Sequence, residues 1–326
     1  MILEANTKYW DTGRAAKVKR IVFDNTFGQK EAVELVKSRE GRIDLVTELS
    51  PLETLRVAES PLAAVVKNRG SRTSVFGRFN MVKTGSPWND VRVRRAANFA
   101  INRADLVQYA TNGNGVVIPA FVPGLQDPTL APYPFDSGRA RELLRESGHS
   151  QTLAVTMIAP QNLQAQATVI GRMLDQSGFR ATVEILDGTA YSKRTLLSHL
   201  DQPADKQSWD IALTASFQAL SSPLLDLYQW YAIDGPDDWV AERPELRRLY
   251  EQALGTIDLA KQEDVLRQMD RHSHEQAYLL FLYNPIRLYA VNRAVRLVPY
   301  ATTWTRLADT SLTDQHWSLR KGDSKK

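Results

Sequence analysis

The sequence lacks most of the residues and patterns on which covalent chemistry depends. It contains no cysteine, which excludes disulfides, thiolate metal sites and a thiol nucleophile. It also contains no Gly-x-Ser-x-Gly elbow, no Walker loop and no Gly-x-Gly-x-x-Gly motif. Its five histidines are scattered, and the nearest two, His272 and His274, would point to different faces of a helix. We expect these two to lie at a solvated helix end. We therefore expect no enzymatic activity, no metal site and no cofactor.

Two further absences limit the class of protein. No apolar run is long enough to span a membrane, and the opening stretch MILEANTKYWDTGR lacks the apolar core of a secretion signal. The excess of positive charge is also small, because 41 Lys and Arg face 37 Asp and Glu. A dispersed excess of this size does not indicate nucleic-acid binding, so we expect no nucleic-acid partner.

The chain instead shows an alternation of strand-like and helix-like segments. Strand patterns occupy 19–24, 43–46, 63–70, 74–80, 152–160, 179–186, 209–216, 278–284 and 287–292. Helical patterns occupy 28–40, the stretch after Ser50, 137–147 with Asp136 as its cap, 163–178 and 244–277, the last as one or two helices. This alternation predicts an α/β fold, with helices packed over a sheet.

The stretch NDVRVRRAANFAINRADLV, residues 89–107, combines an apolar stripe with four arginines. Asn89 or Asp90 can cap a helix, and Asn102 can cap a second one. The expected buried stripe consists of Val93, Ala96, Ala97, Ala100 and Ile101. We expect Arg92, Arg94, Arg95 and Arg103 to lie mostly off this stripe as solvated, architectural charges. Contact with an anionic or acidic ligand is the alternative.

Five stretches of the sequence, taken in order, share the motifs of one protein family. They are NTKYWDTGRAAKVKRIVF, GRIDLV, FNMVKTGSPWNDVRVRRAANFAINRADLV, YPFDSGRARELLRESGH and WDIALTAS. In these stretches the chain resembles the extracytoplasmic solute-binding proteins of ABC importers, in the peptide, nickel and oligosaccharide-binding family 5. The third stretch resembles the family's most characteristic block. The resemblance extends over almost the whole chain.

The resemblance implies a two-lobed periplasmic-binding-protein-like fold (type II, large cluster). Residues 1–84 would form part of lobe one, 85–283 a complete lobe two, and 284–326 a return to lobe one with a polar tail. In the family the Asn-x-x-Tyr-Trp segment lies well into the chain, after a signal peptide. We therefore expect this sequence to be a C-terminal portion, with lobe one incomplete and the signal sequence absent.

The function implied by the resemblance is capture of a small solute in an interlobe cleft. The solute would be peptide-like, a sugar or another small molecule, delivered to ABC permease subunits in the membrane. The protein would be a monomer, either periplasmic or extracytoplasmic and membrane-associated. An alternative is the effector-sensing domain of a transcription regulator whose DNA-binding part is absent. A third possibility is a truncated remnant that binds nothing.

The segment after the strand WDIAL departs from the peptide-binding relatives. In those relatives a Trp and then aspartates precede a proline, and one aspartate pairs with the ligand's α-ammonium group. Here TASFQALSSP places Ser216, Ala219 and Ser222 at these positions, counted back from Pro223. A buried ammonium group without a carboxylate is costly to desolvate, so recognition of a free amino terminus is not expected.

Aromatic faces and neutral hydrogen-bonding groups suit sugars or apolar ligands instead. The alternative for each aromatic residue is an ordinary place in the core. Our candidate ligand-binding residues are Asn80, Ser216, Phe217, Gln218, Trp230, Tyr231 and Tyr283.

Overall fold

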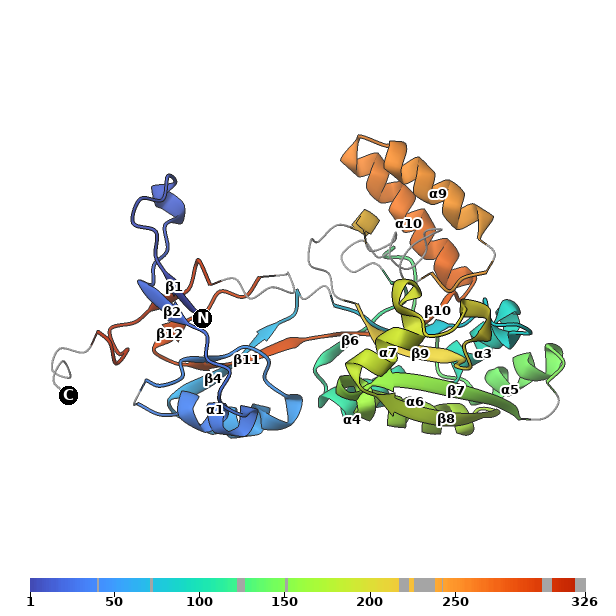
Figure 1. Ribbon diagram of the computed structural model, residues 1–326, viewed down its shortest axis with the longest axis horizontal. Coiled ribbons are helices and arrows are strands. Elements are labelled where there is room, and N and C mark those ends of the chain that lie inside the picture. Colours follow the sequence, from blue (N-terminus) through green and yellow to red (C-terminus); the bar gives the residue numbers. More distant parts are fainter. Residues whose placement is uncertain are drawn as a thin grey trace. The chain divides into compact units, whose positions relative to one another are not determined.

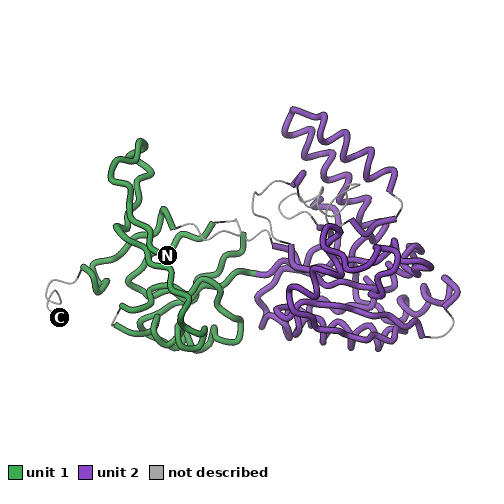
Figure 2. Tube along the Cα trace, viewed as in Figure 1, with its two compact units in different colours: residues 1–71, 286–326 green, residues 72–285 purple. Residues whose placement is uncertain are grey.

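The chain divides into two compact units in a computed structural model (Figure 2). Unit 1 consists of residues 1–71 and 286–326, and unit 2 of residues 72–285. The structure describes residues 1–39, 41–70, 73–121, 127–149, 152–216, 223–225, 238–241, 243–300 and 307–319. In the described part of the chain, no helix is both long and apolar enough to cross a membrane.

Unit 2 is built on a six-stranded sheet with the order β6-β10-β5-β9-β7-β8. Its strands are β5 (Val75–Phe79), β6 (Gly115–Val117), β7 (Leu153–Pro160), β8 (Phe179–Leu186), β9 (Ile211–Ala215) and β10 (Leu279–Pro285). β7 pairs in parallel with β8 and β9, whereas β5 pairs antiparallel with β9 and β10. The start of β5 therefore lies at the same end of the sheet as the carboxyl ends of β7, β9 and β10.

Helices of unit 2 pack around this sheet (Figure 1). They are α3 (Val91–Phe99), α4 (Arg103–Thr111), α5 (Ser137–Glu146), α6 (Gln164–Asp175), α7 (Gly188–Thr195), α9 (Pro244–Gly255) and α10 (Leu259–Glu275). The predicted caps are confirmed, since the side chains of Asp90, Asn102 and Asp136 accept backbone N–H groups at the starts of α3, α4 and α5. The predicted helical region 244–277 is two helices, which pack together as a hairpin.

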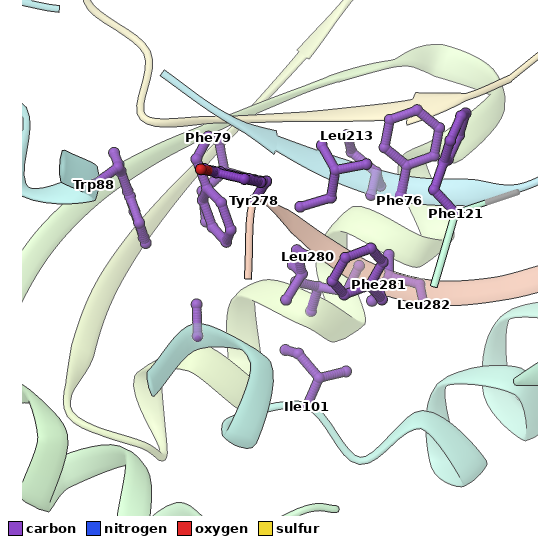
Figure 3. Packing of buried hydrophobic residues seen from close by; sticks show 14 of the residues in the cluster. Phe76, Phe79, Trp88, Ile101, Phe121, Leu213, Tyr278, Leu280, Phe281 and Leu282 are labelled. Carbon is purple, nitrogen blue, oxygen red and sulfur yellow. The ribbon is translucent and has the colours of Figure 1, made fainter. Parts of the chain in front are cut away.

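The core of unit 2 is apolar and rich in aromatic rings (Figure 3). Trp88 stacks on Phe79 with ring centroids 4.5 Å apart, and Phe76 meets Phe121 edge-on at 4.8 Å. The predicted stripe on α3, continued by Ala100 and Ile101, is buried in this core. Because each stripe residue recurs after three or four positions, one helix face supplies a continuous apolar surface.

Unit 1 is smaller and has its own core. Its elements are β1 (Ile2–Glu4), β2 (Arg20–Val22), α1 (Gln29–Val36), β3 (Leu45–Val46), α2 (Thr54–Ala58), β4 (Ala63–Asn68), β11 (Arg287–Asn292), β12 (Val295–Arg296) and β13 (Ser311–Leu312). The strands β3, β11 and β4 form a three-stranded sheet in that order. Val33 and Val36 of α1 pack with Ile286, Leu288 and Ala290 from the returning segment. The α/β fold predicted from the sequence is confirmed.

The divisions between units differ from the predicted lobe boundaries. The first lies at 71–72, where the sequence indicated 84–85, and the return lies at 285–286, where it indicated 283–284. The reason is β5, which the prediction assigned to lobe one. In the structure β5 lies between β9 and β10 and is an inner strand of the unit 2 sheet.

Two of the four arginines are buried, which corrects the expectation of solvated charges. Arg94 and Arg103 are each only 4% exposed. Arg103 donates from Nε to Phe281 O (2.7 Å) and from Nη1 to Tyr133 O (3.0 Å). It also donates to Ile101 O and to both the backbone and side-chain oxygens of Asn98. Burial lowers the pKa of Arg103 to about 10, still far above neutral pH, so the group stays charged.

Arg94 and Arg95 tie α3 to the carboxyl end of α10. Arg94 donates to the carbonyls of Trp88, Asn89 and Gln276, and Arg95 donates to the carbonyl of Glu275. Burial lowers the pKa of Arg94 to about 10 as well. The architectural role predicted for the arginines is therefore confirmed, although for Arg94 and Arg103 it arises from buried hydrogen bonds to neutral oxygens.

The first prediction concerns Arg103. The variant Arg103→Met removes every N–H donor of the guanidinium and leaves several buried carbonyl oxygens without that partner. We expect the free energy of unfolding to fall by about 3–5 kcal/mol. Urea unfolding followed by circular dichroism measures the loss as a lower midpoint. The matched control is Arg92→Met on the same stretch, because Arg92 is exposed and pairs with Asp90 at the surface. Equal midpoints for the two variants would contradict the structural role of Arg103.

Candidate functional site

A group of neutral polar residues lies where β5 begins and where β9 and β10 end. We call it the serine edge; it consists of Ser74, Ser216, Asn284 and the carbonyl of Phe121. Ser216 N donates to Ser74 O (2.8 Å), and Ser74 N donates to Ser216 Oγ (2.9 Å). Ser74 Oγ donates to Asn284 Oδ1 (2.7 Å) and lies 3.4 Å from Phe121 O. Three strands and one loop are therefore joined by short side chains.

The position of the serine edge follows from strand direction. Val75 pairs with Ala215 and with Tyr283, so the residues beyond these positions converge at one sheet end. The carboxyl ends of the parallel strands β7 and β9 lie at the same end. In open α/β sheets, ligands bind outside the carboxyl ends of the strands. The serine edge is therefore our candidate site.

Ser216 is the one predicted ligand-binding residue that the structure places at this edge with its polar groups. It is buried and continues β9 through its exchange of hydrogen bonds with Ser74. Phe217, Gln218, Trp230 and Tyr231 lie outside the described residues. Their ligand-binding role stays a prediction, as does that of Ser216.

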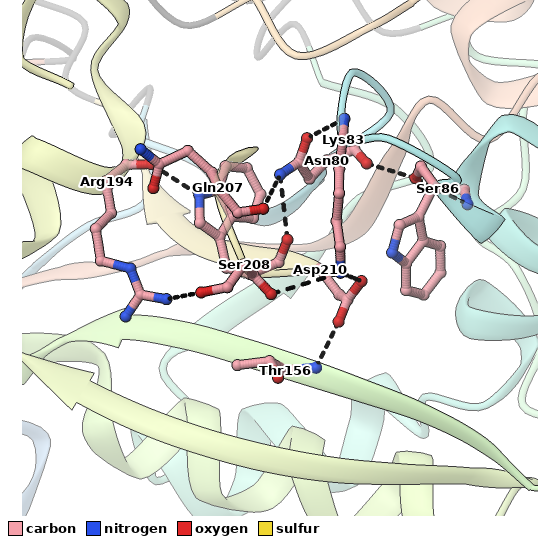
Figure 4. A network of polar contacts seen from close by, with 10 residues as sticks. Asn80, Lys83, Ser86, Thr156, Arg194, Gln207, Ser208 and Asp210 are labelled. Atoms are coloured by element: carbon pink, nitrogen blue, oxygen red, sulfur yellow. Dashed lines mark hydrogen bonds and ion pairs between the residues drawn. The ribbon is translucent and has the colours of Figure 1, made fainter. Parts of the chain in front are cut away.

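Asn80 lies at the opposite end of β5 (Figure 4). It is 0% exposed, and its Nδ2 donates to Trp209 O (3.1 Å) while its Oδ1 accepts from Lys83 N (3.0 Å). Nearby, Asp210 accepts from Lys83 Nζ (2.9 Å) and from Thr156 N (2.8 Å), which fastens β7 to β9. The structure thus gives Asn80 a structural role and does not bring it together with Ser216.

Tyr283 lies near the serine edge but inside the core. It is 1% exposed, and its hydroxyl accepts from Gln166 Nε2 of α6 at 3.0 Å. Burial raises the pKa of Tyr283 to about 12, so the phenol stays neutral. Neither Asn80 nor Tyr283 joins the hydrogen bonds of the serine edge, and their ligand-binding role stays a prediction.

The described parts of the proline-rich segment, residues 118–121 and 127–134, are held to α10 at several points. Phe121 N donates to Asp270 Oδ1 (3.1 Å), and Arg271 Nε donates to Asp127 Oδ2 (2.9 Å). Tyr133 donates from its hydroxyl to His274 O (2.6 Å). The carbonyl of Tyr133 in turn accepts from Arg103. The segment that supplies Phe121 to the serine edge is therefore fixed on both sides of that residue.

His274 is a contact that the sequence did not indicate. Its Nδ1 lies 2.7 Å from Pro119 O, and because a carbonyl only accepts, this nitrogen carries the proton. The ring lies 4.5 Å from that of Tyr133 and 5.9 Å from that of Phe281. We expected a solvated helix end here, and for His274 this is wrong. A histidine near the end of a helical pattern carries no signal that distinguishes the two environments.

Comparison with known proteins assigns this chain to a family. Over residues 1–237 the chain matches the family described as bacterial extracellular solute-binding proteins, family 5 middle. The chain belongs to this family. The resemblance stated from the sequence is thereby confirmed.

Individual relatives agree with the family match. The glutathione-binding protein GsiB of Salmonella choleraesuis (strain SC-B67) is 31% identical over 138 residues, covering 38% of this chain and 26% of GsiB. The periplasmic binding protein DppA from Helicobacter pylori, solved with peptide STSA, superposes with a TM-score of 0.77 at 22% identity. The substrate-binding protein CtaP from Listeria monocytogenes superposes with a TM-score of 0.81 at 17% identity. These structural likenesses confirm the periplasmic-binding-protein fold.

The structural matches cover most of this chain but only part of each relative. The superposition on DppA covers 95% of this chain and 60% of DppA. The superposition on CtaP covers 96% of this chain and 64% of CtaP. The chain therefore spans less than two thirds of these solved neighbours. The relatives support the transport interpretation and give no support to the alternative of an effector-sensing domain.

The second prediction uses the partly buried position of His274 in this family 5 chain. Burial, and the nearby charges of Arg103 and Arg95, lower the pKa of His274, whereas its hydrogen bond to Pro119 O opposes the shift. A histidine with a lowered pKa binds fewer protons when folded than when unfolded, near pH 6.5 and below. Its contribution to stability is thus complete above the unfolded pKa and is lost as the pH falls toward the folded pKa.

We therefore expect His274→Gln to reduce the fall in thermal midpoint between about pH 7.5 and pH 5.5. Differential scanning calorimetry of variant and parent measures this difference, and titrating carboxylates cancel because both proteins share them. His199→Gln, at an exposed position, is the matched control for replacing a histidine by glutamine. An identical pH dependence for parent and His274→Gln would show that His274 does not couple folding to pH.

Proposed function

We propose that this chain captures a solute for an ABC importer and presents it to the membrane permease outside the cytoplasm. The observation that carries the proposal is the family match over residues 1–237, together with fold likeness over 95% of the chain to a transporter-associated binding protein. The function needs no covalent step. We propose a monomer that acts by binding alone.

We propose that the ligand contacts the serine edge and residues of the segment that follows Ser216 in the sequence. Ser74, Ser216 and Asn284 are neutral, and their hydrogen bonds to one another give the edge a fixed geometry. The next residues, Phe217 and Gln218, and the later Trp230 and Tyr231 would add aromatic faces and an amide. Ligand sites of this kind combine apolar walls with a few polar groups that fix orientation.

The charge of the loop restricts the ligand. The stretch TASFQALSSP, residues 214–223, contains no carboxylate. An α-ammonium group that left water there would lose its hydration without a negative partner, which is unfavourable. DppA was solved with the peptide STSA and GsiB is a glutathione-binding protein, so family members do take peptides. We propose that this chain has no strong preference for ligands with a free α-amino group.

The third prediction tests this ligand class. Isothermal titration calorimetry with di- and tripeptides, their N-acetylated forms and a panel of oligosaccharides should show no loss of affinity on acetylation. For any ligand that binds, Trp230→Ala should weaken the affinity by roughly tenfold, because an aromatic wall contributes ~1–2 kcal/mol. Tyr109→Ala, at an exposed position on α4, is the control and should leave the affinity unchanged.

Tight peptide binding that acetylation abolishes would contradict the ligand class while leaving the family role intact. Asp226 would then be the first carboxylate to replace, since it follows Pro223 by three residues on the same loop. A separate result, binding of none of these compounds, would count against the proposed function of this chain.

A further inference from the structure

The serine edge has side-chain donors that no acceptor uses among the described residues. Ser216 Oγ accepts from Ser74 N at 2.9 Å, and within the described part of the chain its own O–H group has no acceptor. Asn284 Oδ1 accepts from Ser74 Oγ at 2.7 Å, and no described residue accepts from Asn284 Nδ2. The edge therefore has one O–H group and the two N–H groups of an amide to offer to a ligand.

The orientation of Asn284 follows from its bond to Ser74. Ser74 Oγ has a single hydrogen and lies near two oxygens, Asn284 Oδ1 at 2.7 Å and Phe121 O at 3.4 Å. The shorter contact directs the amide oxygen of Asn284 toward Ser74, so Nδ2 is directed away from Ser74. Ser216 is 2% exposed and Asn284 is partly buried. Both donors therefore lie in surroundings with little water.

Unused donors in such surroundings favour a ligand that brings an acceptor. A hydroxyl or amide hydrogen that leaves water and finds no acceptor is unfavourable, and nearly all buried polar groups in native proteins have a partner. Spare lone pairs on an oxygen are tolerated more often than a buried N–H group without an acceptor. A ligand oxygen that accepts from Ser216 and Asn284 would supply the partner that both lack.

We propose that Ser216 and Asn284 bind an uncharged carbonyl oxygen of the solute, such as that of an amide; the proposal rests on the proposed function. A carbonyl oxygen has two lone pairs and no hydrogen, so it can accept from both side chains. The two donors flank one residue, because Ser216 bonds the backbone nitrogen of Ser74 and Asn284 bonds its hydroxyl. Asn284, which the sequence did not single out, is then a specificity-determining residue.

A carbonyl group fits these donors better than a carboxylate or a sugar hydroxyl. Among the described residues, no basic side chain shares a hydrogen bond with Ser74, Ser216 or Asn284. A carboxylate would therefore leave water without a cationic partner, which is unfavourable. A sugar hydroxyl brings a hydrogen of its own and requires an acceptor as well as a donor. The unused groups of Ser216 and Asn284 are donors, and they match an oxygen that only accepts.

Isothermal titration calorimetry of the whole chain with three matched compounds tests the proposal. N-acetyl-trialanine amide carries no charge, trialanine amide has a free ammonium group, and N-acetyl-trialanine has a free carboxylate. We expect the parent to bind N-acetyl-trialanine amide. Asn284→Asp keeps an oxygen for Ser74 Oγ but loses both N–H donors and places a carboxylate beside the carbonyl oxygen. It should weaken this binding by about tenfold or more.

The same variant should also change the preference for an amino group. Relative to N-acetyl-trialanine amide, trialanine amide should gain about tenfold or more in Asn284→Asp, because an ammonium group pairs with the introduced carboxylate. Asn284→Leu removes the donors without adding charge, so it should weaken the uncharged compound and leave this ratio as in the parent. Asn25→Asp, at an exposed position of unit 1, is the matched control for the added charge. Thermal midpoints should show that each variant is folded.

The outcomes separate this proposal from the proposed function. An unchanged ratio in Asn284→Asp, or equal affinity of the parent and Asn284→Leu for the uncharged compound, would overturn the role of Asn284. Tighter binding of N-acetyl-trialanine than of its amide would contradict an uncharged group. A parent that binds oligosaccharides but none of the three compounds would refute the carbonyl class and leave the proposed function in place. Binding of neither kind of compound would count against both.

Discussion

A buried guanidinium requires several oxygen acceptors around it, because it carries five N–H donors and keeps its charge at neutral pH. Arg103 meets this demand with oxygens from three places: the end of α3, strand β10 at Phe281, and the proline-rich segment at Tyr133. These places share no local sequence signal, yet the same side chain joins them. Strand β10 leads to Asn284 and the proline-rich segment supplies Phe121, so two components of the serine edge depend on elements that Arg103 positions.

The sequence predicted local structure well because local structure depends on near neighbours. The stripe on α3 and the caps Asp90, Asn102 and Asp136 follow from spacings of two to four residues, and all are present. The environment of Arg103 could not be predicted in this way, since Phe281 lies 178 positions away. Periodicity shows which residues lie outside the apolar stripe. It does not show whether another element places an oxygen acceptor next to them.

The same limit explains how far the candidate site could be predicted. Ser216 was found because it follows a recognisable strand, and the family motifs mark the loop after it. Asn80 and Ser216 fall at opposite ends of the sheet because β5 and β9 run antiparallel, as the pairing of Phe79 with Ile211 shows. Strand pairing is a long-range property that single-strand patterns do not contain. The first unit boundary differs from the predicted one for the same reason, because β5 is recognised as a strand of unit 2 only from its pairing with β9 and β10.

The proposed ligand binding would depend on more than the segment that follows Ser216 in the sequence. Pro119 and Phe121 lie on one short stretch, which His274 and Asp270 hold against α10, and the carbonyl of Phe121 lies 3.4 Å from Ser74 Oγ. A site that is already ordered loses less conformational entropy when it binds, so these contacts lower the cost of capture. In the proposed function, the neutral chemistry of the serine edge would then select among ligands, because its hydroxyl and amide groups would orient a polar solute without neutralising a charge. Substitutions on α10, a helix outside the loop, should therefore alter affinity through the geometry of Ser74.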